Sequence, residues 1–367
     1  GFSPNIKNLL PDIQAFKPSI LLVVPRVLEK VYNAASSKAG GGLKGRMFAW
    51  SAKQARSYSV AQQRTFGPSL TKKLRHGLAD ALVLKKIRSV LGPNLRYIVS
   101  GGAPLATDLA QFYAGMGITL IQGYGLSETT GPIAVQHLGA NPIGTVGLPL
   151  PGNFIKIAKD GEILVRGQAV MPGYYHLPEE TQAVMPDGRW FHTGDIGSIS
   201  RNGQLSITGR KKELIVTAGG KNVSPEILED ALATHPLIAN VIVVGDQRPF
   251  IGALITLDAE MLPDWLRKHG LPRCSPAEAA QLPEVQASLE RAIERANKAV
   301  SRAESIRKFR IIDASFTVEN GYVTPSMKLR RRKVISDYAH EIDELYGGPV
   351  EATEKPRRRF SFRRREH

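Results

Sequence analysis

Residues 122–129, Gln-Gly-Tyr-Gly-Leu-Ser-Glu-Thr, combine residue types that suit a nucleotide site. Glycines on both sides of Tyr124 let a ligand approach the backbone closely, and the tyrosine ring can stack on a base. The carboxylate of Glu128 can hold a magnesium ion beside phosphates. The segment follows a predicted strand, and ligands of open parallel sheets collect at the carboxyl ends of strands. These residues therefore predict binding of a nucleotide with magnesium.

Residues 100–105, Ser-Gly-Gly-Ala-Pro-Leu, also stand between a predicted strand and a predicted helix. Bare backbone N–H groups at such a position suit a flat or anionic ligand. Taken alone, the segment is as typical of a tight strand-to-helix turn. Its meaning depends on the motif that follows it.

Asp195 is a further candidate, between Gly194 and Ile196 in the run 187–197. A carboxylate at a glycine turn can accept a hydrogen bond from each of the two hydroxyls of a ribose. Thr-Gly-Asp is a common sequence, and a plain turn is the alternative. We expect the nearby His192 to be an ordinary packed or solvent-facing residue.

Two basic segments could act on phosphates. Residues 210–213 are all charged, which in isolation is typical of a solvated surface turn. Residues 324–331 include Lys328, and a mobile ammonium there could neutralise charge that builds up during phosphoryl chemistry. The alternative for this second segment is a cluster from Lys328 to Lys333 that binds anions loosely.

In this order, the motifs resemble those of the adenylate-forming superfamily, which comprises acyl-CoA synthetases, luciferases and peptide-synthetase adenylation domains. Residues 123–128 match its Gly-Tyr-Gly-x-Ser/Thr-Glu motif. Residues 187–197 also resemble the signature of fatty acyl-CoA synthetases. The resemblance covers about residues 5–347 and implies a long-chain fatty acid as the acid that is activated.

The resemblance also implies a role for each matching residue. Lys328 and Glu128 would be catalytic, with Glu128 as the magnesium ligand, Tyr124 stacked on adenine, Asp195 on the ribose and Lys212 as the hinge. The CoA-binding set at the pantetheine entrance would be Gly219, Gly220 and Lys221. The full nucleotide-binding set would be Gly101, Gly102, Ala103, Gln122, Gly123, Tyr124, Gly125, Ser127, Asp195, Ile207 and Arg210.

The implied reaction has two steps and uses ATP, Mg²⁺ and coenzyme A. The carboxylate attacks the α-phosphorus of ATP to give acyl-AMP and pyrophosphate, and the CoA thiolate then displaces AMP. Two alternatives stay open: an acyl-AMP ligase that loads a carrier protein, and a non-catalytic nucleotide-binding or interaction fragment. The family's Gly-, Ser- and Thr-rich phosphate loop is not found in these residues, so we expect the chain alone to be inactive and to be part of a longer protein.

The elements that must position these residues follow an α/β pattern. Strands predicted at 20–24, 95–100 and 118–121 alternate with helices at 25–36, 43–91 and 105–115, which predicts a mainly parallel sheet. Residues 143–209 contain short strands broken by Gly and Pro and predict a β-rich subdomain. A smaller α+β lid domain is expected at 210–347, with strands at 239–244 and 253–257 and a long helix at about 282–300. The predicted large domain is therefore 1–209, and its hinge to the lid is 210–212.

Charge is concentrated at the end of the chain. The formal net charge is +16, and residues 355–367 carry seven Lys and Arg against one Glu. We expect residues 348–367 to form a disordered basic tail, whose two phenylalanines among arginines would suit an anionic membrane; nucleic acid is the less favoured partner. The single cysteine, Cys274, excludes an internal disulfide and favours the cytoplasm. Peripheral contact at the inner membrane face is expected from the basic tail. The first residues show no signal peptide.

Overall fold

The computed structural model describes residues 1, 3, 8–40, 42–139, 142–324 and 329–348. Its first elements are α1 (Leu9–Phe16), β1 (Ile20–Val23), α2 (Pro25–Ala39), α3 (Gly42–Gln62), α4 (Leu70–Ala79), the π-helical turn η1 (Asp80–Leu84) and α5 (Lys85–Leu91). The predicted strand, turn and helix around Pro25 are confirmed, because Pro25 is the first residue of α2. The helical prediction for 43–91 is confirmed as well.

The first sheet has five strands in the order β1-β2-β3-β4-β5. Its further elements are β2 (Tyr97–Ser100), α6 (Thr107–Gly115), β3 (Thr119–Leu126), the 3₁₀ turn η2 (Ser127–Thr129), β4 (Gly131–Val135) and β5 (Leu148–Pro149). β1, β2 and β3 pair in parallel, as predicted. β4 and β5 add in antiparallel fashion, because η2 reverses the chain directly after β3. The sheet is therefore mixed, and its parallel half carries both glycine motifs.

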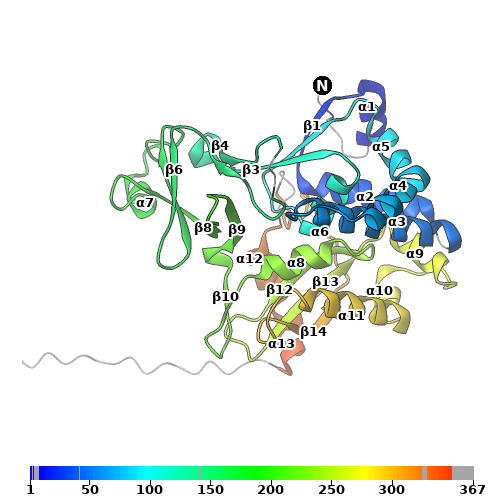
Figure 1. Cartoon of the computed structure of the whole chain (residues 1–367). Helices are drawn as coiled ribbons and strands as arrows, with labels where there is room; N and C mark the ends of the chain where they lie inside the picture. Colours follow the sequence, from blue (N-terminus) through cyan, green and yellow to red (C-terminus); the bar gives the residue numbers. More distant parts are fainter. Residues whose placement is uncertain (2, 4–7, 41, 140–141, 325–328, 349–367) are drawn as a thin grey trace, which may run out of the picture.

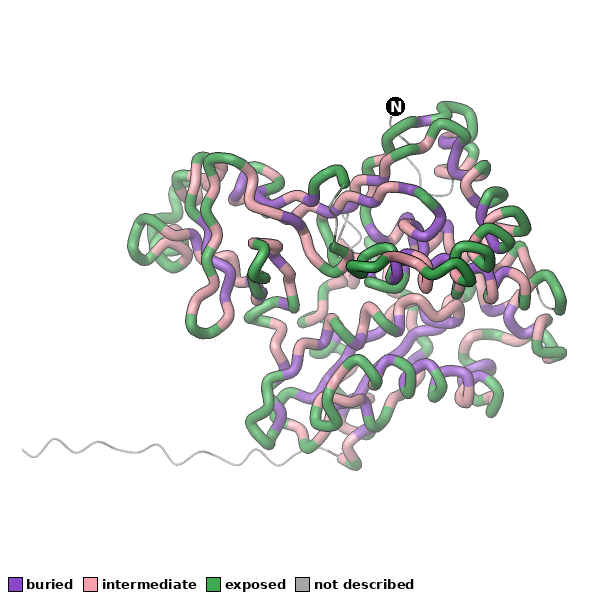
Figure 2. The backbone as a smooth tube through the Cα atoms, in the orientation of Figure 1, coloured by how far each residue is buried: buried purple, intermediate pink, exposed green. Residues whose placement is uncertain are grey.

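The core of this part lies between the sheet and its helices. Leu109, Phe112 and Tyr113 of α6 are buried against α3 and α2, and the Tyr113 hydroxyl donates a hydrogen bond of 2.8 Å to the Leu28 carbonyl oxygen. Buried backbone follows the strands and the inner faces of the helices (Figure 2). This packing fixes the end of β2 and the start of α6, where residues 100–105 lie.

A second sheet, of four antiparallel strands in the order β6-β7-β8-β9, confirms the predicted β-rich subdomain. It consists of β6 (Asn153–Ile157), β7 (Glu162–Gly167), β8 (Phe191–Ile199) and β9 (Leu205–Arg210), with helix α7 (Pro178–Val184) between β7 and β8. Asp195 therefore lies inside a strand, and the prediction that a turn holds it was wrong. Gly194, directly before it in the same strand, has a φ of +72°.

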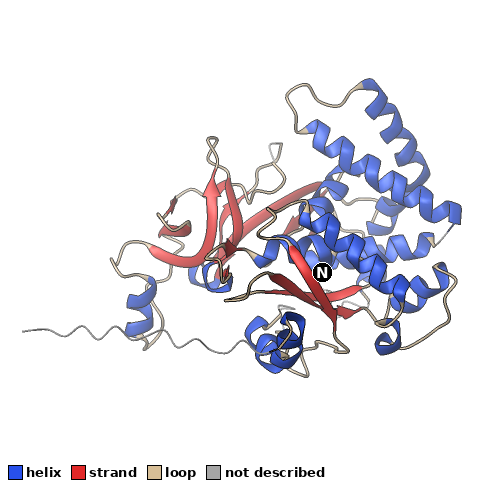
Figure 3. Ribbon diagram, turned by 90° about the horizontal axis from the view of Figure 1, so that it is seen from below, coloured by secondary structure: helices blue, strands red, loops and turns tan. Residues whose placement is uncertain are grey.

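The C-terminal part is the α+β unit that the sequence predicts. Its elements are η3 (Lys211–Glu213), β10 (Ile215–Val216), β11 (Asn222–Val223), α8 (Pro225–Ala233), β12 (Ile238–Val244), β13 (Ile251–Leu257), α9 (Leu262–Lys268), α10 (Pro276–Ala279), α11 (Pro283–Asn297), β14 (Ile306–Ile311), α12 (Arg331–Asp337) and α13 (Ala339–Tyr346). β12, β13 and β14 form a sheet in that order. Figure 3 separates the helix-rich side of the molecule from its strand-rich side. None of the helices in the described ranges is long and apolar enough to cross a membrane.

The N- and C-terminal parts meet along α2 and α8. Figure 1 shows α8 lying between the first sheet with its helices and the sheet of the C-terminal part. Arg26 donates to the Ala239 carbonyl oxygen at 3.3 Å, and the Ser37 hydroxyl donates to the Asp264 carboxylate at 2.7 Å. These contacts join α2 to β12 and α9 of the C-terminal part.

Candidate nucleotide-binding cleft

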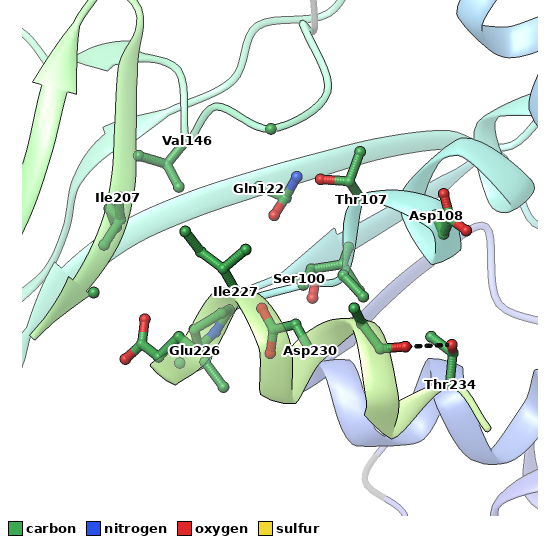
Figure 4. Close-up of a pocket in the computed structure, with 18 of the residues that line it drawn as sticks. Ser100, Thr107, Asp108, Gln122, Val146, Ile207, Glu226, Ile227, Asp230 and Thr234 are labelled. Atoms are coloured by element: carbon green, nitrogen blue, oxygen red, sulfur yellow. Dashed lines mark hydrogen bonds between the residues drawn. The ribbon is translucent and has the colours of Figure 1, made fainter. Parts of the chain in front are cut away.

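A cleft of about 1040 Å³ lies between the first sheet, the second sheet and helices α8 and α11. The motif residues that line it are Gly102, Ala103, Gln122, Gly123, Tyr124, Gly125, Asp195, Ile207 and Arg210. Figure 4 shows Gln122 and Ser100 facing Asp230 of α8 across the cleft. Segments far apart in the sequence are thus gathered at one place, at the carboxyl ends of β2 and β3.

The remaining predicted residues are not among those that line the cleft in the described structure: Gly101, Ser127, Glu128, Lys212, Gly219, Gly220 and Lys221. Lys212 is exposed in η3, and Lys221 forms an ion pair of 3.2 Å with Glu304. Lys328 lies outside the described residues. Thr324 and Leu329, which flank the segment containing it, both line the cleft.

Tyr124, Asp195 and Arg210 form one connected group. The Tyr124 hydroxyl donates to Oδ2 of Asp195 at 2.7 Å, and Nε of Arg210 lies 3.3 Å from Oδ1. The register of the second sheet explains the second contact, because Asp195 of β8 is paired directly with Arg210 of β9. Three motifs predicted separately therefore converge on one carboxylate.

Burial controls the electrostatics of this group. Tyr124 is 8% exposed and Asp195 is 5% exposed. Burial, and then the nearby Asp195 charge, raise the pKa of the Tyr124 phenol well above its ordinary value. Tyr124 thus stays a hydrogen-bond donor to the carboxylate, and Asp195 is held in one orientation with its oxygens at the cleft wall.

Glu128 sits beside the cleft and is held by a residue that the sequence interpretation missed. The Tyr174 hydroxyl donates to Oε1 of Glu128 at 2.9 Å. Burial, and then this carboxylate, raise the pKa of Tyr174. The described residues contain no group of three or more His, Cys, Asp or Glu that could hold a metal. A single oriented carboxylate fits Mg²⁺ that is bound mainly by phosphates and water.

Gly125 of residues 122–129 and Gly102 of residues 100–105 are required for two different reasons. A Cβ atom on Gly125 would lie 1.9 Å from the carbonyl oxygen of Gly131 in β4, so the close strand pairing requires glycine there. Gly102 has φ +79° and is exposed at the cleft, as a ligand-facing turn residue should be. The sequence interpretation, that Gly125 is a glycine because a ligand approaches the backbone there, was therefore incomplete.

Gln136 and Ser100 are two further polar residues that the sequence interpretation passed over. Buried Gln136 accepts from the Gln122 amide at 2.9 Å and donates to the carbonyl oxygens of Pro142 and Thr145, which shapes the loop at the cleft mouth. The Ser100 hydroxyl is buried, lines the cleft and has no hydrogen-bond partner in the described structure. A buried unpaired hydroxyl is costly, and a ligand in the cleft could supply its partner.

The floor of the cleft is acidic. Glu226 and Asp230, one turn apart on α8, both line the cleft (Figure 4). Burial is the main reason that the pKa of each carboxyl is raised to about 7. Neighbouring charges add to this, from Glu213 and Glu229 at Glu226 and from Glu226 at Asp230, while Arg210 opposes it at Glu226. The sequence shows α8 as an ordinary amphipathic helix, so this cluster could not be predicted.

Comparison with known proteins supports the motif assignments. The model for AMP-binding enzymes matches residues 2–175, and that for the C-terminal domain of AMP-binding enzymes matches residues 212–349. The chain is 49% identical over 347 residues to a long-chain-fatty-acid–CoA ligase, FadD15, of Mycobacterium bovis. The chain belongs to the adenylate-forming AMP-binding enzymes. The alignment covers 94% of this AMP-binding enzyme and 58% of FadD15, so the chain spans little more than half of its relative's length.

Solved structures agree on the fold of this AMP-binding enzyme. The adenylation domain of a carboxylate reductase from Mycobacterium chelonae has a TM-score of 0.69 and 22% identity, covering 94% of this chain and 49% of that domain. The corresponding domain from Segniliparus rugosus, solved with AMP and a co-purified carboxylic acid, has a TM-score of 0.65 and 22% identity over 94% of this chain and 49% of its own. The expected combination of a large α/β part and a smaller C-terminal part is therefore confirmed.

Proposed function

We propose that the protein containing this chain activates a long-chain fatty acid with ATP and transfers it to coenzyme A. The observation that carries the proposal is the Tyr124–Asp195–Arg210 group at the wall of the cleft, in a chain 49% identical to a long-chain-fatty-acid–CoA ligase. An adenosine fits this wall, with an aromatic ring for the base and a fixed carboxylate for the ribose hydroxyls.

In this proposal the chain's own residues mainly bind and orient ATP and the fatty acid. Tyr124 and the backbone of 101–103 border the adenine, Gln122 and Ile207 bound the cleft, and Asp195 fixes the ribose. Arg210 approaches the ribose and α-phosphate with a charge that does not titrate. Mg²⁺, when bound with ATP beside Glu128, would reduce the negative charge on the phosphates. Such positioning places the fatty carboxylate in line with the α-phosphorus.

Lys328 would act in the first half-reaction, as the ammonium that offsets charge on the attacking carboxylate and leaving pyrophosphate. Support comes from Thr324 and Leu329, which line the cleft on either side of residues 325–328. Gly219, Gly220 and Lys221 are absent from the residues that line it. We therefore assign this arrangement to the adenylate-forming pose, and propose that rotation at Lys212 brings 219–221 to the pantetheine entrance for the second step.

The domain boundaries and the tail belong to the same proposal. We place the large domain at 1–209 and the lid at 210–347; the first family match ends at residue 175 and the second begins at residue 212, the last residue of the hinge. For residues 348–367, almost all outside the described residues, we propose contact with an anionic membrane at the cytoplasmic face. Loss of vesicle cosedimentation on deleting 349–367, strongest at low salt, would support this. Unchanged cosedimentation would refute it.

The decisive test uses the protein expressed from its complete source gene. Palmitate, ATP, Mg²⁺ and CoA are supplied, and pyrophosphate, AMP and palmitoyl-CoA are measured for wild type, Lys328→Ala and the matched control Arg332→Ala. Lys328→Ala should lose about 10²–10³ in adenylation rate, and Arg332→Ala should stay near wild type. Accumulation of acyl-AMP without thioester to CoA would favour a carrier-protein ligase. Absence of all products with acids of any length would favour a non-catalytic protein.

A further inference from the structure

Glu162, the first residue of β7, is a buried carboxylate with donors on three sides. It is 4% exposed. Oε1 accepts from the Gly194 amide at 2.9 Å, and Oε2 lies 3.1 Å from Nδ1 of His192 and 2.8 Å from Nζ of Lys211. Gly194 directly precedes Asp195, and Lys211 directly precedes Lys212. One carboxylate therefore contacts the segment that carries the ribose-side carboxylate and the segment that carries the hinge.

The charge of Glu162 is maintained in this buried place. Burial alone would raise its pKa, but the hydrogen bonds from Lys211, His192 and Gly194 outweigh burial and hold the pKa of Glu162 below its ordinary value. The hydrogen bonds that Lys211 donates to Asp160, whose Oδ2 lies 2.6 Å from Nζ, and to Glu162 raise the pKa of Lys211. Both partners are thus ionised at neutral pH, and the contact is a charge-assisted one.

We propose that Glu162 is a positioning residue that anchors the start of the hinge to the nucleotide-binding sheet. Residue 211 is fixed to β7 while residue 212 is exposed in η3, so a rotation of the lid is confined to Lys212 and the residues after it. The same carboxylate holds Gly194, and hence the Asp195–Arg210 pair, while the lid moves. The inference rests on the proposed function, because it gives the hinge a mechanical support within the same reaction.

Three variants distinguish an anchoring role of Glu162 from a purely structural one. Glu162→Gln keeps an oxygen for Gly194 and removes the charge that holds Lys211. Lys211→Met removes the other partner at a side chain that is 45% exposed, so it offers a second route if Glu162→Gln folds poorly. Because it also removes a trypsin site, it is compared by the half-reaction rates alone. The matched control is Asp80→Asn, which breaks the half-buried ion pair of Asp80 with Arg88 far from the cleft.

Two readouts separate anchoring from stability. The first is limited trypsin digestion at residues 210–212, located by mass spectrometry, which needs no catalytic activity. The second is the rate of each half-reaction, acyl-AMP formation and thioester formation from supplied acyl-AMP. Glu162→Gln should speed cleavage at 210–212 and slow both half-reactions, each by about tenfold, and the double variant with Lys211→Met should be no slower than the worse single variant. Asp80→Asn should change neither readout.

The outcomes are distinct. Unchanged cleavage and unchanged half-reactions in Glu162→Gln would overturn the anchor, as would additive losses in the double variant. If the wild type makes no acyl-CoA from any acid, the proposed function fails, and hinge cleavage still decides whether Glu162 fixes Lys211. If the wild type is active and only the thermal midpoint falls, equally in Glu162→Gln and Asp80→Asn, the role is merely structural.

Discussion

Asp230→Asn tests the acidic floor of the cleft. Asp230 lies on α8 against the first sheet, and its carboxyl has a pKa raised from 3.8 to about 7 by burial and by the neighbouring charges of Glu226, Glu229 and Glu29. A carboxyl with a raised pKa favours the folded, closed arrangement when it is protonated. Its stabilising contribution is fully present below about pH 4 and is lost progressively as the pH rises to about 7, above which the loss is complete.

The magnitude follows from this pKa difference. A rise from 3.8 to about 7 corresponds to a ceiling of about 4 kcal/mol above pH 7, at about 1.4 kcal/mol per pKa unit. Water reaches the cleft, so we halve this to about 2 kcal/mol for the ionised aspartate. An asparagine cannot ionise and avoids this cost. It should therefore stabilise the protein at pH 7.5 by about 2 kcal/mol and at pH 5 by well under half as much.

The assay is thermal unfolding of the wild type, Asp230→Asn and the control Glu290→Gln, an exposed carboxylate on α11, at both pH values. For a protein of this size, about 2 kcal/mol should raise the midpoint by roughly 3 °C at pH 7.5, and the smaller effect at pH 5 should raise it by about 1 °C. Glu290→Gln should change it little at either pH. A lower midpoint for Asp230→Asn at pH 7.5, or equal shifts at both pH values, would refute the reasoning.

Three further predictions concern the cleft wall. Tyr124→Phe removes a hydrogen bond to a buried charge, worth about 1.5–3 kcal/mol, and should raise the KM for ATP at least tenfold; an unchanged KM would show that Asp195 is oriented without it. Tyr174→Phe frees the Glu128 carboxylate and should raise the Mg²⁺ concentration needed for half-maximal pyrophosphate release several-fold, about 1 kcal/mol; a shift in maximal rate alone would contradict this. Gly125→Ala should lower the unfolding midpoint by several degrees, since its Cβ meets backbone at 1.9 Å, and wild-type stability would exclude the close pairing of β3 and β4.

Much of the fold could be predicted because buried strands are apolar in the sequence. Several strands were not predicted, and β8 and β14 illustrate two different reasons. β8 contains Gly194, Asp195 and Gly197 and was interpreted as a loop motif. β14 carries Arg and Lys among Ile and Phe, because it is the edge strand of its sheet and half of it faces solvent. Hydrophobic pattern alone does not distinguish such strands from loops.

The candidate site could be predicted as a set of motifs but not as a network. Tyr124, Asp195 and Arg210 were each identified, yet their contacts depend on strand register, which the sequence does not specify. Tyr174 and Glu162 do not belong to any motif that could be recognised in the sequence. They act by holding Glu128 and Lys211, and such partners emerge only when distant strands are brought together.

The direct pairing of Asp195 with Arg210 across β8 and β9 also bears on how such enzymes can be recombined. A chimera that takes its lid from a relative is usually joined where the two domains appear to separate. In this chain, a junction before residue 210 would import a foreign arginine and lysine into contacts made by the host's Asp195 and Glu162. A crossover placed after Lys211 keeps both ion pairs native, and it leaves the hinge residue itself to travel with the donor lid.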